Sequence, residues 1–356
     1  MNALSDLTLE ELQGRLAEWG FKPSHAARLL RSFYAGAGQI EWAELKVPGG
    51  LRERVEGEYG AGLLPVAARQ VAADGTTKLL LRLTDGKTIE AVMMPDHRAD
   101  RVAGCISSQV GCAMGCDFCA TAQSGFERNL TGGEMVEQFL HLRREAQAVG
   151  RRLQTVVFMG MGEPMLNLGN MLEAIQRMAG NKLGGLGGRQ ITVSTVGIVP
   201  GIEALAAARL GVNLAISLHA PDDATRARLL PAGRRFGVEE ILTAADRFQA
   251  ENNGRPMSIQ YCLLQGVNDS PGQARQLAAL LEHRRMHVNL LHFNPTGASL
   301  SGRIFAASSP EAAQAFIAEL RSRRVVTHFR RPRGRDIDAA CGQLRQRAAG
   351  DPAKTS

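Results

Sequence analysis

The sequence has no apolar run of about 18 residues, the length that crosses a membrane as a helix. It also has no recognisable secretory leader, and only 6 of its 356 residues are cysteine. These absences argue against a membrane-spanning protein and against a secreted domain stapled by disulfides. They predict a cytoplasmic chain whose thiols serve chemistry.

Lysine is scarce as well. Lys and Arg together number 42 against 35 Asp and Glu, which gives a net charge of +7. Because arginine supplies nearly all of these cations, guanidinium groups dominate the positive surface. Arginine pairs bidentately with phosphates and stacks on bases, which favours a folded RNA partner. A genome rich in arginine codons produces the same composition, so composition alone leaves both explanations open.

The first part of the chain predicts a small helical domain over residues 1–65. Thr8 and Glu11 form a capping-box pattern that starts one helix, and Pro23 with Ser24 opens a second. Residues 66–97 predict a β-meander, because apolar and polar side chains alternate and Asp-Gly pairs supply tight turns. A chain of 356 residues has room for these units beside one large catalytic domain.

The remaining length, residues 98–345, alternates apolar strand-like runs with helical stretches. The predicted strands are residues 155–160, 190–195, 212–218, 257–263 and 288–293. This rhythm is typical of repeated βα units, so we predict an α/β fold with a parallel sheet or barrel. Residues 346–356 have the composition of a disordered tail.

Residue types suited to chemistry follow these predicted strands. In folds built from βα units, the active site lies at the C-terminal ends of the strands. The residues at these ends are Gly162, Glu163, Ser194, Ser217, Leu218, His219 and Asn294. We therefore expect them to lie together at one edge of the sheet.

Three cysteines, Cys112, Cys116 and Cys119, stand in one short run with the spacing C-x3-C-x2-C. Soft thiolates hold iron-sulfur clusters, and three of them bind a cubane 4Fe-4S cluster while leaving one iron open. An open iron can chelate the amino and carboxylate groups of S-adenosylmethionine (SAM) and pass an electron to its sulfonium. The alternative is a structural zinc ion, which needs four ligands, commonly two C-x2-C pairs, and the chain has no second pair.

Two further cysteines, each within a distinctive short sequence, narrow the choice of protein family. Cys105 precedes the triplet in CISSQVGC, and Cys341 lies in GRDIDAACGQL near the C-terminal end. Together with the triplet, these blocks resemble the RlmN/Cfr family of radical SAM RNA methyltransferases over nearly the whole chain. The resemblance implies a partial (βα)6 radical SAM barrel with an N-terminal helical accessory domain. It also implies a 4Fe-4S cluster and two SAM molecules per turnover.

The same resemblance implies a reaction at C2 of adenine. This carbon is electron-poor, so polar methyl transfer lacks a nucleophile and a radical route is needed. One SAM methylates Cys341, and a second is cleaved to a deoxyadenosyl radical that takes hydrogen from the methyl-cysteine. The methylene radical adds to adenine, and Cys105 then attacks the sulfur of Cys341, which releases the product and forms a transient disulfide. Glu90 matches the family's proton acceptor.

Family motifs also assign SAM contacts and partners. Glu163, preceded by Gly162, matches the residue that accepts the methionine amino group. The remaining SAM contacts match Ser194, Ser217, Leu218, His219 and Asn294. The implied RNA partners are 23S rRNA and tRNA, and the implied electron donor is a low-potential protein of the flavodoxin or ferredoxin type. We expect the chain to act as a monomer.

Each assignment has a structural alternative. Without the family pattern, Cys105 and Cys341 fit buried apolar cysteines equally well. Glu90 also fits an exposed strand carboxylate, and His219 also fits a structural histidine. Cys262, in the middle of a predicted strand, matches no functional position and is predicted to pack in the core.

Arginines are frequent in two segments, one after the strand predicted at residues 212–218 and one directly before the block that contains Cys341. They are Arg226, Arg228, Arg234, Arg235, Arg330, Arg331, Arg333 and Arg335. Segments that grip RNA phosphates have this composition, although a solvated basic face has it as well.

Three rival functions stay open at this point. Methylation at C8 of the same adenine uses the same cysteines. A radical SAM enzyme acting on a peptide or small molecule has no need of the arginines. A zinc-stabilised RNA-binding module contains zinc in place of iron and consumes no SAM.

Overall fold

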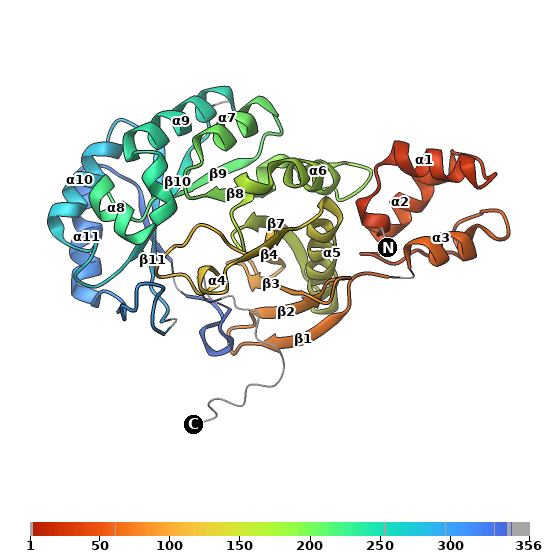
Figure 1. Cartoon of the computed structure of the whole chain (residues 1–356), viewed down its shortest axis with the longest axis horizontal. Helices are drawn as coiled ribbons and strands as arrows, with labels where there is room; N and C mark the ends of the chain where they lie inside the picture. Colours follow the sequence, from red (N-terminus) through yellow and green to blue (C-terminus); the bar gives the residue numbers. More distant parts are fainter. Residues whose placement is uncertain are drawn as a thin grey trace.

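The computed structural model of the chain describes residues 3–60, 62–252, 254–295, 297–330, 332–339 and 343. Its framework is a sheet of ten strands (Figure 1). In spatial order these are β1 (Val66–Val71), β2 (Thr77–Arg82), β3 (Thr88–Pro95), β4 (Arg101–Cys105), β7 (Arg152–Phe158), β8 (Ile191–Thr195), β9 (Asn213–Ser217), β10 (Met257–Leu263), β11 (Met286–His292) and β12 (Thr327–Arg330). Across the described ranges, no helix is both long and apolar enough to cross a membrane.

The adjacent strands β4, β7, β8, β9, β10, β11 and β12 run parallel to one another. At the other end of the sheet, β1 pairs antiparallel with β2, β2 with β3, and β3 with β4. Six of the parallel strands, β4 to β11 in spatial order, correspond to the predicted partial barrel, and β12 extends its edge. The predicted α/β class with a partial (βα)6 barrel is therefore confirmed. The strands β4 and β12 were not predicted, because each is short and mixes polar with apolar residues.

Helices connect the parallel strands and cover the outer face of the sheet (Figure 1). The longer ones are α5 (Gly132–Ala148), α6 (Leu168–Ala179), α7 (Val199–Ala207), α9 (Val238–Glu251), α10 (Pro271–Leu281) and α11 (Pro310–Ser322). Two short ones are α4 (Ala120–Gln123) and α8 (Asp223–Leu229). Single turns of 3-10 helix are η1 (Leu4–Asp6), η2 (Pro164–Asn167), η3 (Gly188–Gln190), η4 (Pro231–Arg235) and η5 (Arg335–Ile337).

Side chains on β10 show why the barrel interior is polar. Ile259 and Tyr261 join the main hydrophobic cluster with the helices. Because strand side chains alternate, Ser258, Gln260 and Cys262 lie on the opposite face, toward the interior. The amide nitrogen of Gln260 donates to the hydroxyl of Ser258 at 3.0 Å. The outer face thus supplies the core, and the inner face is left for polar groups.

The β-meander brings three side chains from different strands onto that inner face. Its strand register pairs Lys78 of β2 with Val92 of β3, and Val92 with Cys105 of β4. Residues directly opposite one another in a sheet point to the same face, and so do residues two apart on one strand. Lys78, Glu90 and Cys105 therefore share the face that lines the barrel interior.

The N-terminal helices are α1 (Leu9–Glu18), α2 (His25–Ala35) and α3 (Leu51–Tyr59). The predicted capping box is confirmed, since the Glu11 amide donates to the hydroxyl of Thr8 at 3.2 Å and the Thr8 amide donates to the Glu11 carboxylate at 2.7 Å. Apolar side chains of all three helices belong to the same buried cluster as those of the barrel. In Figure 1 these helices lie beside α5 and α6. The division at residue 65 stays a prediction.

A buried carboxylate joins the N-terminal segment to the barrel. Glu137, on α5, accepts a hydrogen bond from the Ser5 hydroxyl at 2.6 Å and another from the Leu64 amide at 2.6 Å. One turn further along α5, a ring nitrogen of His141 lies 2.8 Å from the Leu64 carbonyl oxygen. Burial raises the pKa of Glu137 from 4.5 to about 7, and the two donors offset only part of that effect.

Replacing Glu137 with glutamine is expected to reduce the pH dependence of stability. Because the pKa of Glu137 is higher in the folded chain, about 7, than its ordinary 4.5, its stabilising contribution is complete below pH 4.5 and is lost as pH rises through 7. The loss is about 3 kcal/mol at alkaline pH, since a tenfold change in a proton-binding constant corresponds to about 1.4 kcal/mol. Glutamine stays neutral and can keep both hydrogen bonds.

Denaturant unfolding of the wild-type protein and Glu137→Gln at about pH 5 and about pH 8 measures this difference. The two proteins should have similar stability at the lower pH, and the variant should be more stable at the higher one. The same pH dependence in both proteins contradicts the expectation.

Candidate functional site

The predicted site residues lie at the C-terminal ends of the parallel strands, as expected. Glu163 follows β7, Ser194 is the penultimate residue of β8, and Ser217 ends β9. The hydroxyl oxygens of Ser194 and Ser217 are 3.3 Å apart, so two neighbouring strands present hydroxyls to one space. His219 follows β9, and Asn294 follows β11.

The three clustered cysteines occupy the loop between β5 (Gln109–Gly111) and α4. The backbone of this loop is tightly turned: the Cys119 amide donates to the Cys116 carbonyl at 3.0 Å, and the Cys112 amide donates to the Gly125 carbonyl at 2.8 Å. Burial raises the pKa of Cys112 to about 12. Burial, followed by the charges of the other two thiolates, raises the pKa of Cys116 well above its ordinary value. The three sulfurs are thus close enough to repel one another when ionised.

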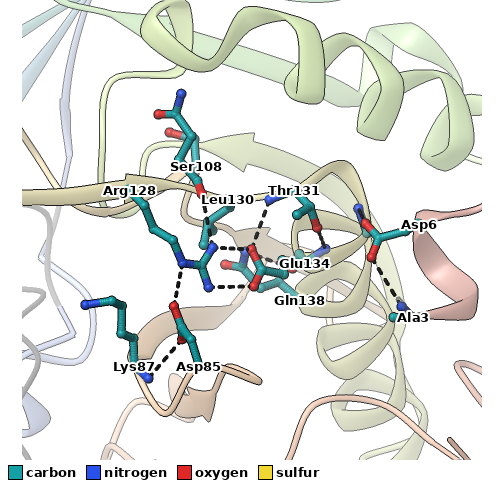
Figure 2. Close-up of polar contacts among 12 residues, drawn as sticks. Ala3, Asp6, Asp85, Lys87, Ser108, Arg128, Leu130, Thr131, Glu134 and Gln138 are labelled. Carbon is teal, nitrogen blue, oxygen red and sulfur yellow. Dashed lines mark hydrogen bonds and ion pairs between the residues drawn. The ribbon is translucent and has the colours of Figure 1, made fainter. Parts of the chain in front are cut away.

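Arg128 stabilises the hairpin that leads into this loop by pairing with carboxylates of two other elements. It lies on β6 (Phe126–Asn129), which pairs with β5 directly before the cysteines. Its guanidinium donates to both oxygens of Glu134 at 2.8 Å and to Asp85 at 2.7 Å, as Figure 2 shows. These carboxylates raise the pKa of Arg128. One side chain therefore joins the cysteine hairpin, the first turn of α5 and a turn of the β-meander.

Asp117, within the same loop, attaches it to the segment that follows β11. This side chain is buried, and its two oxygens accept from the Ser301 amide at 2.8 Å and the Ser301 hydroxyl at 2.6 Å. Phe118 packs edge-on against the ring of His219, with 4.9 Å between the ring centroids. The cysteine loop is consequently held against the end of β9 and the segment after β11.

Glu163 is buried in the space between β7 and β8. Its carboxylate accepts from the Met165 amide at 3.1 Å and from the Val196 amide at 2.9 Å. Burial raises its pKa to about 7. Gly162 before it has a φ of +100°, and a Cβ there would lie 2.6 Å from the Cβ of Gln109. Glycine is therefore required where the chain passes Gln109 of β5, the strand that leads into the cysteine loop.

His219 is held as a neutral ring in a strained backbone conformation. Its φ is +59°, which is uncommon for a residue other than glycine. Burial and, to a smaller extent, the nearby charge of Arg226 lower its pKa to about 3. Its Nδ1 accepts from the Cys262 amide at 2.9 Å, so Nε2 carries the proton. Backbone strain of this kind is typical of functional sites.

Asn294 offers a buried acceptor to a ligand. Its side-chain nitrogen donates to the His292 carbonyl at 3.4 Å. Its side-chain oxygen is buried and, among the described residues, has no hydrogen-bond partner. A buried amide oxygen left in this state is expected to pair with a donor from a bound molecule. The role of Asn294 as a SAM contact stays a prediction.

The donor set fits the expected cofactors. In the described part of the chain, no three or more His, Cys, Asp or Glu side chains are arranged as ligands of one metal ion. In a cubane cluster each cysteine binds a different iron, so the sulfurs lie farther apart than around a single ion. Three thiols in one braced loop, the carboxylate of Glu163 and the acceptor of Asn294 match what a cluster and SAM require.

Glu90 and Cys105 lie together on the inner face. Glu90 is buried, so the alternative of an exposed strand carboxylate is wrong. The ammonium of Lys78 lies 3.2 Å from its Oε1. Cys105 belongs to a small hydrophobic cluster with Val92, Met161 and Ala339, separate from the main core.

Cys341 lies outside the described residues, as do Arg331 and the predicted tail. Residues on either side of Cys341 are described, however. Ala339 belongs to the same hydrophobic cluster as Cys105, and the side-chain nitrogen of Gln343 lies 3.5 Å from the Pro295 carbonyl, next to Asn294. The described residues that flank Cys341 in the sequence therefore reach the cluster of Cys105 and the loop of Asn294.

One of the predicted RNA-contacting arginines is placed differently. Arg226 is 1% exposed, so the prediction that it grips RNA is wrong. Its position on α8, four residues after the helix-capping Asp222, turns it inward with Thr225 and Leu229. There its guanidinium donates to the carbonyl of Val196, the residue whose amide binds Glu163. Other arginines of the set that are exposed are Arg228, Arg234, Arg235, Arg330 and Arg335.

Sequence reasoning missed two residues that shape the site. Asp117 stands inside the C-x2-C pair, where its place between two cysteines was a usable signal. Lys78 had no such signal, since a lysine in a meander ordinarily points to solvent. Only the strand register places it on the inner face.

Comparison with known proteins finds relatives over almost the whole chain. The family model described as the Radical SAM superfamily matches residues 106–306. A curated protein of Opitutus terrae, named probable dual-specificity RNA methyltransferase RlmN 1, is 68% identical over 343 residues, which cover 96% of each chain. One of Rhodopirellula baltica, named probable dual-specificity RNA methyltransferase RlmN, is 41% identical and covers 97% of this chain and 91% of its own.

A solved structure has the same architecture. The crystal structure of a radical SAM methyltransferase from Sphaerobacter thermophilus matches with a TM-score of 0.91 at 40% identity. The match covers 98% of this chain and 100% of the other. The N-terminal helices, the meander and the barrel therefore belong to one shared fold.

Proposed function

This chain belongs to the RlmN/Cfr family of radical SAM RNA methyltransferases, and on that premise we propose that it methylates C2 of an adenine in 23S rRNA and in tRNA. The observation that carries the proposal is the position of two described residues, Ala339 and Gln343, which flank Cys341 in the sequence. Ala339 shares a hydrophobic cluster with Cys105, and Gln343 contacts the loop of Asn294 through the Pro295 carbonyl. Both contacts support a role for Cys341 together with Cys105 and the SAM contacts.

The cofactors have their own residues in this proposal. Cys112, Cys116 and Cys119 would hold the 4Fe-4S cluster, which supplies the electron that cleaves SAM to a deoxyadenosyl radical. Glu163 would accept hydrogen bonds from the methionine amino group, whose positive charge offsets the cost of burying the carboxylate. The remaining SAM contacts would come from Ser194, Ser217, Leu218, His219 and Asn294.

The two catalytic cysteines divide the methyl transfer into separate steps. The Cys341 thiolate takes a methyl group from one SAM, and this methyl later loses one hydrogen atom to the deoxyadenosyl radical. The carbon would then join adenine while still bound to sulfur, and the ring would become aromatic again by losing the C2 proton and one electron, which the oxidised cluster would accept. The Cys105 thiolate would attack that sulfur, so that the C–S bond breaks and a disulfide between Cys105 and Cys341 forms. The departing carbon would take a proton and become the methyl group of the released base. Glu90 takes the proton that leaves adenine C2.

The partners follow from the same proposal. The RNA substrates are 23S rRNA and tRNA, and the adenine leaves its stack to reach the barrel interior. A low-potential flavodoxin or ferredoxin supplies electrons. The chain acts in the cytoplasm as a monomer.

Exposed arginines near the C-terminal segment should bind RNA phosphates. Replacing Arg330 and Arg335 with glutamine is expected to weaken RNA binding and to lower the slope of log affinity against log salt by about one unit per lost contact. The matched control is Arg189, which lies just before β8, at the N-terminal ends of the parallel strands. Its replacement should leave the slope unchanged. Equal slopes for the double variant and the wild type would remove these arginines from the RNA interface.

Product analysis tests the proposed function. The protein is reconstituted anaerobically with iron and sulfide, incubated with SAM, a reductant and unmodified 23S rRNA fragment or tRNA, and the nucleosides are identified by mass spectrometry. Methylation at C2 supports the proposal, and methylation at C8 alone assigns the rival specificity. SAM cleavage without RNA methylation points to a different substrate. A colourless protein that contains zinc and no iron points to the RNA-binding module.

A further inference from the structure

A buried lysine lies in the barrel interior beside the proton acceptor. The side chain of Lys78 is 10% exposed, and that of Glu90 is 3% exposed. Lysine is rarely buried to this degree without a specific partner, because its ammonium loses its hydration. Neither the family motifs nor the sequence pattern assigns a role to Lys78.

The ammonium of Lys78 contacts two parts of the proposed machinery. It lies 3.2 Å from Oε1 of Glu90 on the neighbouring strand. It also donates to the backbone carbonyl of Asp338 at 3.4 Å, three residues before Cys341. One side chain thus joins the proton acceptor to the segment that carries the methylated cysteine.

Further contacts hold that segment against the meander. The Ala73 amide donates to the Asp336 carboxylate at 3.0 Å, and the Gly334 amide donates to Asp74 at 3.2 Å. These bonds lie at the turn between β1 and β2, whereas Lys78 reaches the segment from inside the sheet. Several hydrogen bonds therefore fix residues 334–338. Of the residues that make these bonds, Lys78 is the one that also pairs with Glu90.

We propose that Lys78 is a positioning residue for the methyl transfer: it keeps Glu90 ionised and oriented, and it aligns the segment before Cys341 with that carboxylate. The inference rests on the proposed function, in which Glu90 must accept a proton. A buried carboxylate favours its neutral form unless an opposite charge lies within hydrogen-bond distance. A neutral Glu90 has no capacity to take the proton from adenine, so the charge of Lys78 favours that step.

The first variant is Lys78→Met, which keeps a long side chain and removes the charge. It is expected to lower the rate of RNA methylation about 100-fold, the scale of a lost general base. Lys78→Arg keeps the positive charge and should recover at least about tenfold of that loss. Lys87→Met is the matched control, because Lys87 lies in a turn of the same meander and pairs at the surface with Glu127 of β6. It should methylate RNA at the wild-type rate.

A double variant separates positioning from general structural support. If Lys78 acts through Glu90, the rate of Lys78→Met combined with Glu90→Gln should be no lower than that of the slower single variant. If Lys78 only supports the fold, the two losses should multiply. Multiplying losses, or a Lys78→Met protein as active as the wild type, overturns the proposal. So does a Lys78→Arg protein as inactive as Glu90→Gln.

Infrared spectroscopy gives a readout that does not depend on turnover. The carbonyl stretch of a protonated carboxyl should be absent from the wild type and present in Lys78→Met. The double variant Lys78→Met with Glu90→Gln should lose it, which assigns the stretch to Glu90. Absence of the stretch from Lys78→Met contradicts the proposal even if the wild type proves to methylate another substrate. Failure of the wild type to methylate RNA, with the infrared difference present, instead overturns only the proposed function.

Discussion

Replacing Cys116 with alanine is expected to lower the iron content of the reconstituted protein from about four atoms per chain to near zero and to abolish RNA methylation. Two thiolates are too few to hold a cubane cluster with an open iron. The loop itself should stay in place, because Arg128 braces it on one side and Asp117 on the other. Iron and sulfide analysis, together with the visible absorption of the cluster, measures the effect.

Cys262→Ala is the control for this experiment. Cys262 is a buried cysteine in the hydrophobic cluster that Cys116 packs against. If three cysteines hold an open cluster, Cys262→Ala keeps its iron and its activity. Loss of metal from Cys262→Ala as well as from Cys116→Ala would indicate a closed four-thiolate site and would contradict the SAM-binding iron.

The second large effect is expected at Cys105. In Cys105→Ala the methylene carbon can still join adenine, but no thiol remains to attack the sulfur of Cys341. RNA should therefore stay covalently attached to the protein, and release of methylated RNA should fall by about a thousandfold or more, as for loss of an essential nucleophile. Denaturing electrophoresis with labelled RNA detects the adduct.

The adduct must depend on Cys341. The double variant Cys105→Ala with Cys341→Ala should form no adduct, and mass spectrometry of the Cys105→Ala adduct should place the RNA on the peptide that contains Cys341. Free methylated RNA released by Cys105→Ala at the wild-type rate would show that Cys105 does not resolve the intermediate. In that case Cys105 is a packing residue beside Val92 and Ala339.

Five of the six barrel strands, β7 to β11 in spatial order, could be predicted because their sequences are largely apolar runs. The run at residues 257–263 is mostly apolar or small, and β10 has the predicted limits. The short strand β12 could not be predicted, since His328 and Arg330 are polar and its place depends on pairing with β11. Long-range pairing of this kind leaves little trace in a local pattern.

Residues of the candidate site could likewise be predicted where they belong to a local motif, but not where long-range packing determines their position. Residues in motifs, such as Glu163 and Asn294, lie at the strand ends where the βα pattern placed them. Arg226 was misjudged, because its type suggests a surface and only the packing of α8 against the cysteine loop turns it inward. Lys78 was missed for the opposite reason: its neighbours in sequence resemble an ordinary meander, and its partners come from β3 and the C-terminal segment.

The central claim is that the methyl group passes through Cys341 and loses one of its hydrogens on the way to adenine. The most direct test supplies SAM with a fully deuterated methyl group and measures the deuterium in the products by mass spectrometry. The account predicts an adenine methyl that retains two deuterium atoms, together with deoxyadenosine that has gained one. An adenine methyl that retains all three deuterium atoms would mean direct transfer from SAM and would contradict the account.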